Sequence, residues 1–167
     1  MRPITIAVLS LILAAPAAAQ VAGHAEAHGD EDEHVAEAHG LRVTHAWTRA
    51  TGGDEALVFF ELENEGEATV TVTGATSSVG AAGSLAGFRL VDGAPGLMPV
   101  PSLPVEAGAE VDFTPVGLGV LLTGLAAPLV EGGSFVLELE TSAGPVPITV
   151  LVEDADATQH SHAGHAH

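Results

Sequence analysis

The chain has 167 residues, of which 22 are acidic and only 4 are basic. This charge balance argues against nucleic acid and anionic lipid as partners, because both are bound through Lys and Arg. Hydrophobic residues make up 47% of the sequence, which excludes a wholly disordered acidic polymer and fits one folded domain, and the absence of cysteine excludes a disulfide framework.

The first nineteen residues are typical of a secretory signal peptide. Arg2 provides the positive start, residues 4–13 form an apolar run, and residues 17–19 are a small-residue cleavage site before Gln20. The run is shorter than the ~20 residues that span a bilayer. The sequence therefore predicts export to the periplasm with cleavage after residue 19 and no membrane anchor.

Eight of the nine histidines lie in two terminal segments, which we expect to be disordered tails. The N-terminal tail, residues 20–40, includes an acidic run at residues 30–33, and the C-terminal tail covers residues 155–167. Imidazole binds Cu(II), Zn(II) and Ni(II), so such tracts indicate metal binding, although a solubilising leader is the alternative. The predicted ligands are His24, His28, His34, His39, His160, His162, His165 and His167.

Between the tails, residues 41–154 show the two-residue alternation of half-buried strands. The first strand is predicted at residues 41–48 and is followed by short apolar runs separated by Gly-rich turns, one of them at residues 92–96. Many short strands and no helical period predict an all-β domain, an antiparallel β-sandwich with Greek-key links. The further strands are expected at residues 56–63, 68–75, 88–91, 97–100, 110–114, 118–122, 134–140 and 146–152.

His45 is the one histidine outside the tails. By the alternation of the first strand, it shares a face with Trp47. A single strand histidine is more often structural than a ligand. The alternative is that it joins the N-terminal histidines, because Gly40 allows that tail to fold back.

Three phrases of the folded part, in this order and spacing, point to a known family. They are VTHAWTRAT at residues 43–51, FFELENEGEA at residues 59–68, and the stretch from PVEAGAEVDF to GGSFVLEL at residues 104–139. Residues 41–152 thereby resemble the PCu(A)C family of periplasmic copper chaperones. The resemblance implies a cupredoxin-like (Ig-like) sandwich that carries copper to a partner in the assembly of the cytochrome oxidase copper centre.

The family holds Cu(I) with His and Met side chains, and this chain departs from that pattern. If Gly124 and Leu125 are aligned with the family, its His-x-Met pair falls on Gly119 and Leu121, and its earlier His falls near residues 85–87. Met98 alone matches a family ligand, with a gap-filling apolar role as the alternative. One methionine cannot make a Cu(I) site, so we expect the copper site to have moved to the tails, with Cu(II) favoured and zinc as a second ion.

The leading interpretation is a periplasmic copper chaperone whose histidine-rich tails capture copper. The alternatives are a buffer or scavenger of Zn(II), Ni(II) or Cu(II) without a delivery partner, and a structural sandwich with incidental histidines. Imidazoles bind metal only when neutral, so affinity should fall below about pH 6.5. An enzyme is not expected, because the sequence shows no nucleophile next to a base.

Overall fold

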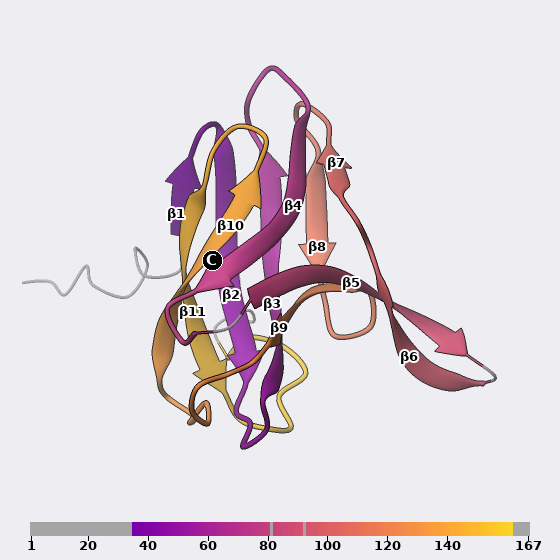
Figure 1. The fold of residues 1–167 in the computed structure, drawn as a ribbon. Helices are drawn as coiled ribbons and strands as arrows, with labels where there is room; N and C mark the ends of the chain where they lie inside the picture. Colours follow the sequence, from indigo (N-terminus) through magenta and orange to yellow (C-terminus); the bar gives the residue numbers. More distant parts are fainter. Residues whose placement is uncertain (1–34, 81, 92, 162–167) are drawn as a thin grey trace, which may run out of the picture.

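The computed structural model describes residues 35–80, 82–91 and 93–161, and every regular element in these ranges is a β-strand (Figure 1). No helix in these ranges is long and apolar enough to cross a membrane. The strands are β1 (Val35–Ala38), β2 (Leu41–Arg49), β3 (Glu55–Asn64), β4 (Val70–Ser77), β5 (Ala82–Val91), β6 (Ala94–Pro99), β7 (Leu103–Val105), β8 (Glu110–Phe113), β9 (Leu118–Thr123), β10 (Ser134–Thr141) and β11 (Val146–Glu153).

The strands form because apolar residues recur at every second position. In β10 and β11, buried and exposed residues alternate along nearly the whole strand. Successive side chains of a strand point to opposite faces, so each strand sends one row of side chains inward. Leu137 and Leu139 of β10 and Val146 and Val150 of β11 are completely buried in the core.

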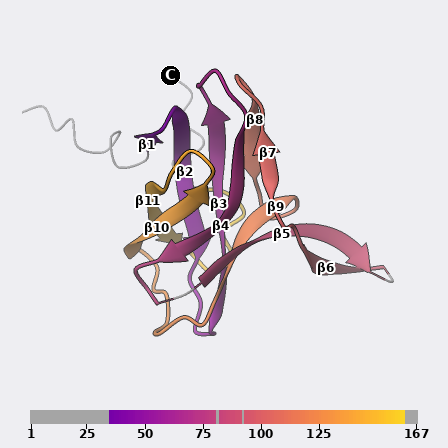
Figure 2. The ribbon, with the colours of Figure 1, turned by 45° about the horizontal axis from the view of Figure 1, so that its top comes forward.

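The strand pairings close around this core. They run from β3 through β9, β5, β4, β10, β11 and β2 back to β3. Most are antiparallel, whereas β11–β2 and β8–β9 are parallel. The prediction of an all-β sandwich is confirmed. The hairpin of β5 and β6 leaves this body and projects to one side in both views (Figures 1 and 2).

The structure differs from the predicted elements in a few places. β1 and β7 were not predicted, and β5 begins six residues before the expected residue 88. The turn predicted at residues 92–96 is shorter, since β6 starts at Ala94 and pairs with Val91. Proline is tolerated in β6 because this strand lies at the edge of the sheet, where a missing N–H breaks no ladder.

The described region also extends beyond the predicted tail boundaries. β1 lies in the segment assigned to the N-terminal tail and pairs with β2, from Val35 opposite Thr44 to Ala38 opposite Leu41. At the other end, residues 155–161 follow β11 and fold back onto the sandwich. Short pairing segments of this kind are set by tertiary contacts more than by local propensity.

Candidate metal-binding site

A β-bulge in β2 positions His45. Thr44 lies opposite Glu61, and Trp47 lies opposite Phe59, so β2 has one more residue than β3 between these pairs. His45 has a φ of 53°, in the left-handed region that side chains other than Gly and Asn rarely adopt. Such a conformation costs about 1 kcal/mol or more, and it is frequent at functional sites.

The chain after β11 brings His160 to the same place. β11 ends at Glu153, and the backbone then turns, with Ala157 N donating to Asp154 O at 3.1 Å. Arg49 of β2 holds this turn, because its Nε donates to Ala157 O at 2.6 Å. His160 is thereby only 1% exposed, although it was predicted to lie in a disordered tail.

The two histidines each contact a carboxylate and lie beside each other. His160 Nδ1 is 3.0 Å from Glu153 Oε1, and the same oxygen accepts hydrogen bonds from Ser161 N and Oγ at 3.1 and 2.9 Å. His45 Nδ1 is 3.3 Å from Glu61 Oε2. The ring centroids are 5.9 Å apart and the rings are nearly perpendicular, at 87°.

These contacts determine which ring nitrogen carries a lone pair. An ionised carboxylate only accepts hydrogen bonds, so Nδ1 of each ring must be the protonated nitrogen. In a neutral imidazole, Nε2 then carries the lone pair. Metal-binding histidines commonly have this arrangement, in which a carboxylate orients the ring through the nitrogen that does not bind the metal.

The histidines border a cleft of about 480 Å³ between β2, β3, β8 and residues 158–160. Its apolar part includes Phe60 and Phe113, whose rings stack with centroids 4.1 Å apart. Trp47 and His45 both line it, although the bulge at residues 45–46 breaks the simple alternation that the sequence predicted for β2. A stacked aromatic pair gives the cleft a rigid wall against which the histidines can be positioned.

Acidic side chains face one another across β3 and β8 next to His45. Glu61 lies opposite Asp112, and Glu63 lies opposite Glu110. Like charges directly opposite are destabilising in a sheet. This row creates a negative potential beside the cleft, which favours the approach of cations.

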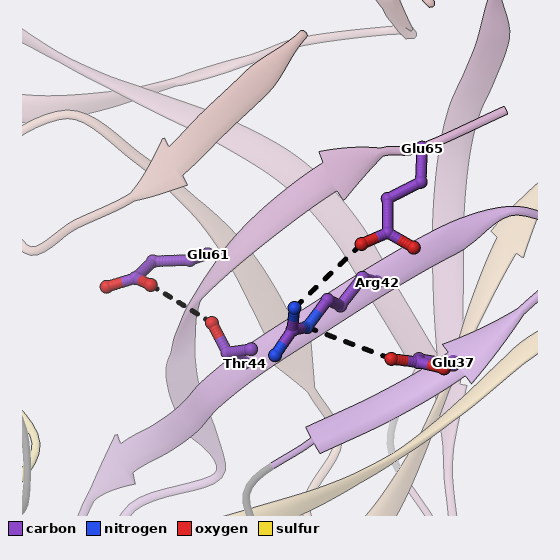
Figure 3. A network of polar contacts seen from close by, with 5 residues as sticks. All are labelled: Glu37, Arg42, Thr44, Glu61 and Glu65. Atoms are coloured by element: carbon purple, nitrogen blue, oxygen red, sulfur yellow. Dashed lines mark hydrogen bonds and ion pairs between the residues drawn. The ribbon is translucent and has the colours of Figure 1, made fainter. Parts of the chain in front are cut away.

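Figure 3 shows the polar contacts at the β2 side of this row. Arg42 lies between Glu37 and Glu65, with N···O distances of 3.8 and 3.9 Å. Thr44 Oγ1 donates to Glu61 Oε2 at 3.0 Å, the same oxygen that contacts His45. The threonine therefore helps to fix the carboxylate that orients the histidine ring.

The other predicted ligands are not part of this cluster. His39 lies in the turn between β1 and β2, where a Cβ added at Gly144 would be 2.6 Å from its Nε2. Within the described ranges, no group of three or more His, Asp or Glu side chains is arranged to hold a metal ion. The remaining predicted ligands, His24, His28, His34, His162, His165 and His167, lie outside the described residues.

The positions to which the sequence alignment assigned the family ligands lie on three adjacent strands. Met98 of β6 lies opposite Gly87 of β5, and Ala86 of β5 lies opposite Gly119 of β9. Met98 is 43% exposed, and its Sδ lies 3.8 Å from Arg89 Nη1. The aligned positions therefore lie close together in the fold, but Met98 is the only one of them with a side chain that could bind Cu(I).

Apolar side chains fill the space that a family ligand at residue 119 would need. A Cβ added to Gly119 would lie 3.2 Å from both Leu57 Cδ2 and Phe59 Cε1. These distances are tighter than ordinary van der Waals contact, so a histidine there would displace its neighbours. The packing of β3 against β9 is therefore built around the absence of a side chain at this position.

Comparison with other proteins agrees with this description of the fold. The family model described as "Putative lipoprotein LpqE-like" matches residues 41–152. The protein named "Putative lipoprotein Lxx21020" of Leifsonia xyli subsp. xyli (strain CTCB07) is 31% identical over 130 residues, which are 77% of this chain and 78% of that protein. The chain belongs to the LpqE-like family.

Solved PCuAC domains share its fold. The apo PCuAC domain of PmoF2 has a TM-score of 0.62 at 23% identity, covering 75% of this chain and 99% of that domain. The copper-bound PmoF2 domain has a TM-score of 0.60 at 18% identity, covering 72% and 98%. Cu(I)-DR1885 of Deinococcus radiodurans has a TM-score of 0.52 at 19% identity, covering 68% and 80%. The sequence-based recognition of a PCu(A)C domain is confirmed.

Proposed function

We propose that this protein is an exported copper-binding protein that captures copper through histidines and passes it to a partner. The observation that carries the proposal is the position of His160, a member of the C-terminal histidine cluster, beside His45 in an acidic cleft. The PCuAC fold supports it, because solved members of that fold include a copper-bound PmoF2 domain and Cu(I)-DR1885.

The choice of histidines follows from the contrast between the two candidate places. The positions matching the family ligands offer one exposed thioether, which is insufficient for Cu(I). Imidazole nitrogens at comparable geometry bind Cu(II) more tightly than Zn(II). We therefore assign Cu(II) as the preferred ion and zinc as the competitor.

The histidines of the two terminal segments are further ligands in this proposal. His34 directly precedes Val35 in the sequence, and His162 follows Ser161, so each is bonded to a described residue. Val35 pairs with Thr44, the neighbour of His45. In the proposal, His24, His28, His34, His39, His162, His165 and His167 capture further copper ions.

Export and delivery complete the proposal. Residues 1–19 have the composition of a cleavable signal, which leads to the periplasm. The names of the family and of its relative describe lipoproteins, whereas these 167 residues include no cysteine for a thioether-linked lipid. Cell fractionation tests this part, since a lipid-anchored form would sediment with membranes. We propose a cytochrome oxidase assembly protein as the partner and assign no catalytic role.

The test is a copper and zinc titration of residues 20–167 by equilibrium dialysis, with Cu(II) and, under reductant, Cu(I). The expected result is at least one Cu(II) bound more tightly than Zn(II) or Ni(II). A matched variant in which the seven histidines outside the cleft are replaced by Asn should lose the additional ions. Weak and equal binding of all three ions would overturn the proposal in favour of a sandwich with incidental histidines.

Delivery needs a separate measurement. The copper-loaded protein is mixed with the apo copper-binding domain of an oxidase subunit, and the absorption of the copper centre is followed with time. We expect transfer faster than from an equally tight small-molecule chelator. Equal rates would instead indicate a buffer or scavenger.

A further inference from the structure

We propose that His45 and His160 together bind one copper ion through their Nε2 atoms, with Glu61 and Glu153 as the orienting carboxylates. The proposal rests on the proposed function and assigns its tightest site to the folded part. The two histidines come from β2 and from the segment after β11, so the site joins the start of the sandwich to its end.

The separation of the rings fits one shared ion. A copper or zinc ion about 2.0 Å from an Nε2 atom lies roughly 3.2 Å from the centroid of that ring. Two rings that share one ion thus have centroids up to about 6.4 Å apart. The observed separation of 5.9 Å between His45 and His160 lies within this limit.

Both rings are held by other parts of the chain, which reduces the ordering cost that flexible ligands would incur on binding. Glu61 accepts a hydrogen bond from Thr44, and Glu153 accepts hydrogen bonds from Ser161 and lies 3.0 Å from His160 Nδ1. Pre-oriented imidazoles bind metal more tightly than those of a free tail. The cleft site should therefore fill first.

The two rings differ in exposure, and the charge around them favours a cation. The side chain of His45 is 40% exposed, while that of His160 is 1% exposed, so one ligand faces solvent and the other is sheltered. Asp112 lines the cleft, and Glu63 lines a second pocket that shares His45 and Glu61 with it, so both add negative charge near the histidine. The pair supplies two ligands, and water occupies the remaining positions of a Cu(II) ion.

A substitution at His45 separates the metal role from a structural one. Glycine adopts positive φ without strain, so His45→Gly removes the ligand and relieves the backbone. The matched control is His39→Gly, because His39 has a φ of 56° and lies outside the cleft. Both variants should keep or raise the metal-free thermal midpoint.

The experiment is a Cu(II) titration of residues 20–167 against a competing chelator, with electron paramagnetic resonance at less than one equivalent of copper. The wild type and His39→Gly should show two imidazole nitrogens and the same first affinity. His45→Gly should weaken the first affinity at least 100-fold, as should His160→Asn. Glu61→Gln should weaken it 10–100-fold, as is typical for an orienting carboxylate.

A variant that keeps only His45 and His160, with the other seven histidines replaced by Asn, decides the case. It should bind one Cu(II) with the affinity of the wild type. If it binds none while the wild type binds copper, the cleft site is overturned and the proposed function rests on the tails. If the wild type binds none either, both proposals fail.

Discussion

Two regions of the sandwich differ in the side chains that they could offer to a metal ion. At β5, β6 and β9, where the family ligands would lie, the chain has glycine, leucine and one exposed methionine. At the bulge of β2, the chain instead has two histidines with carboxylate partners. A shared fold thus brings the same positions together without determining which side chains occupy them.

The stacked aromatic pair is the feature of the cleft whose loss should have the largest effect. Phe113→Ala removes a buried ring that contacts Phe60, and it should lower the free energy of unfolding by about 3–5 kcal/mol. Urea denaturation measures this. Val116→Ala, at an exposed position on the same cleft, should change it by less than about 0.5 kcal/mol. A loss below 1 kcal/mol for Phe113→Ala would mean that the cleft wall is not rigidly packed.

Restoring a family ligand at the other region should fail for reasons of space. Gly119→His places a side chain against Leu57 and Phe59, so we expect a loss of about 1–3 kcal/mol in unfolding free energy and no new Cu(I) site. The control is Gly52→His, because a Cβ at Gly52 meets no atom within 4 Å. If Gly119→His were stable and bound Cu(I), the region would still have room for a histidine at this position, which would contradict the packing argument.

The tether of the C-terminal segment should have a smaller effect. Arg49→Gln loses a charged hydrogen bond to Ala157 O, which is worth about 1 kcal/mol at this partly exposed position. Residues 154–161 should then exchange amide hydrogens faster, and the first copper affinity should fall several-fold. Arg89→Gln, at an exposed arginine of β5, is the control and should change neither quantity. Unchanged exchange in Arg49→Gln would mean that Glu153 alone holds the segment.

The smallest effect is expected at the sulfur. Met98→Leu conserves volume at an exposed edge strand, so the affinity for Cu(I) should change by less than about twofold. Competition with a chromophoric Cu(I) chelator measures it. A tenfold loss of Cu(I) affinity would indicate that Met98 binds copper and that the region of β5, β6 and β9 contains a metal site.

Most of the strands could be predicted from the sequence, because alternation in segments such as β10 and β11 directly reflects burial. β1 could not, since VAEA has weak strand propensity and is a strand only through its pairing with β2. The first half of β5, rich in Gly and Ala, was likewise missed.

The site was predictable only in part. Its residue types were evident, and His160 was among the predicted ligands, but its approach to His45 depends on long-range contacts of the segment after Glu153 with Arg49 and Glu153. The bulge could not be predicted either. Its positive-φ residue is His45, whereas a glycine would have indicated a bulge in the sequence. The roles of Glu61 and Glu153 depend on these long-range contacts, so composition alone could not single them out.

The bulge in β2 also has a consequence for the gene. Thr44 and Trp47 keep their partners Glu61 and Phe59 on either side of it, so a deletion of the single codon for His45 would leave Ala46 opposite Phe60 in an unbroken ladder. Both halves of the strand would remain in register, and no buried side chain would change face. The β2–β3 ladder therefore does not require a residue at this position, and a deletion of His45 would remove the imidazole without changing the register of the sheet.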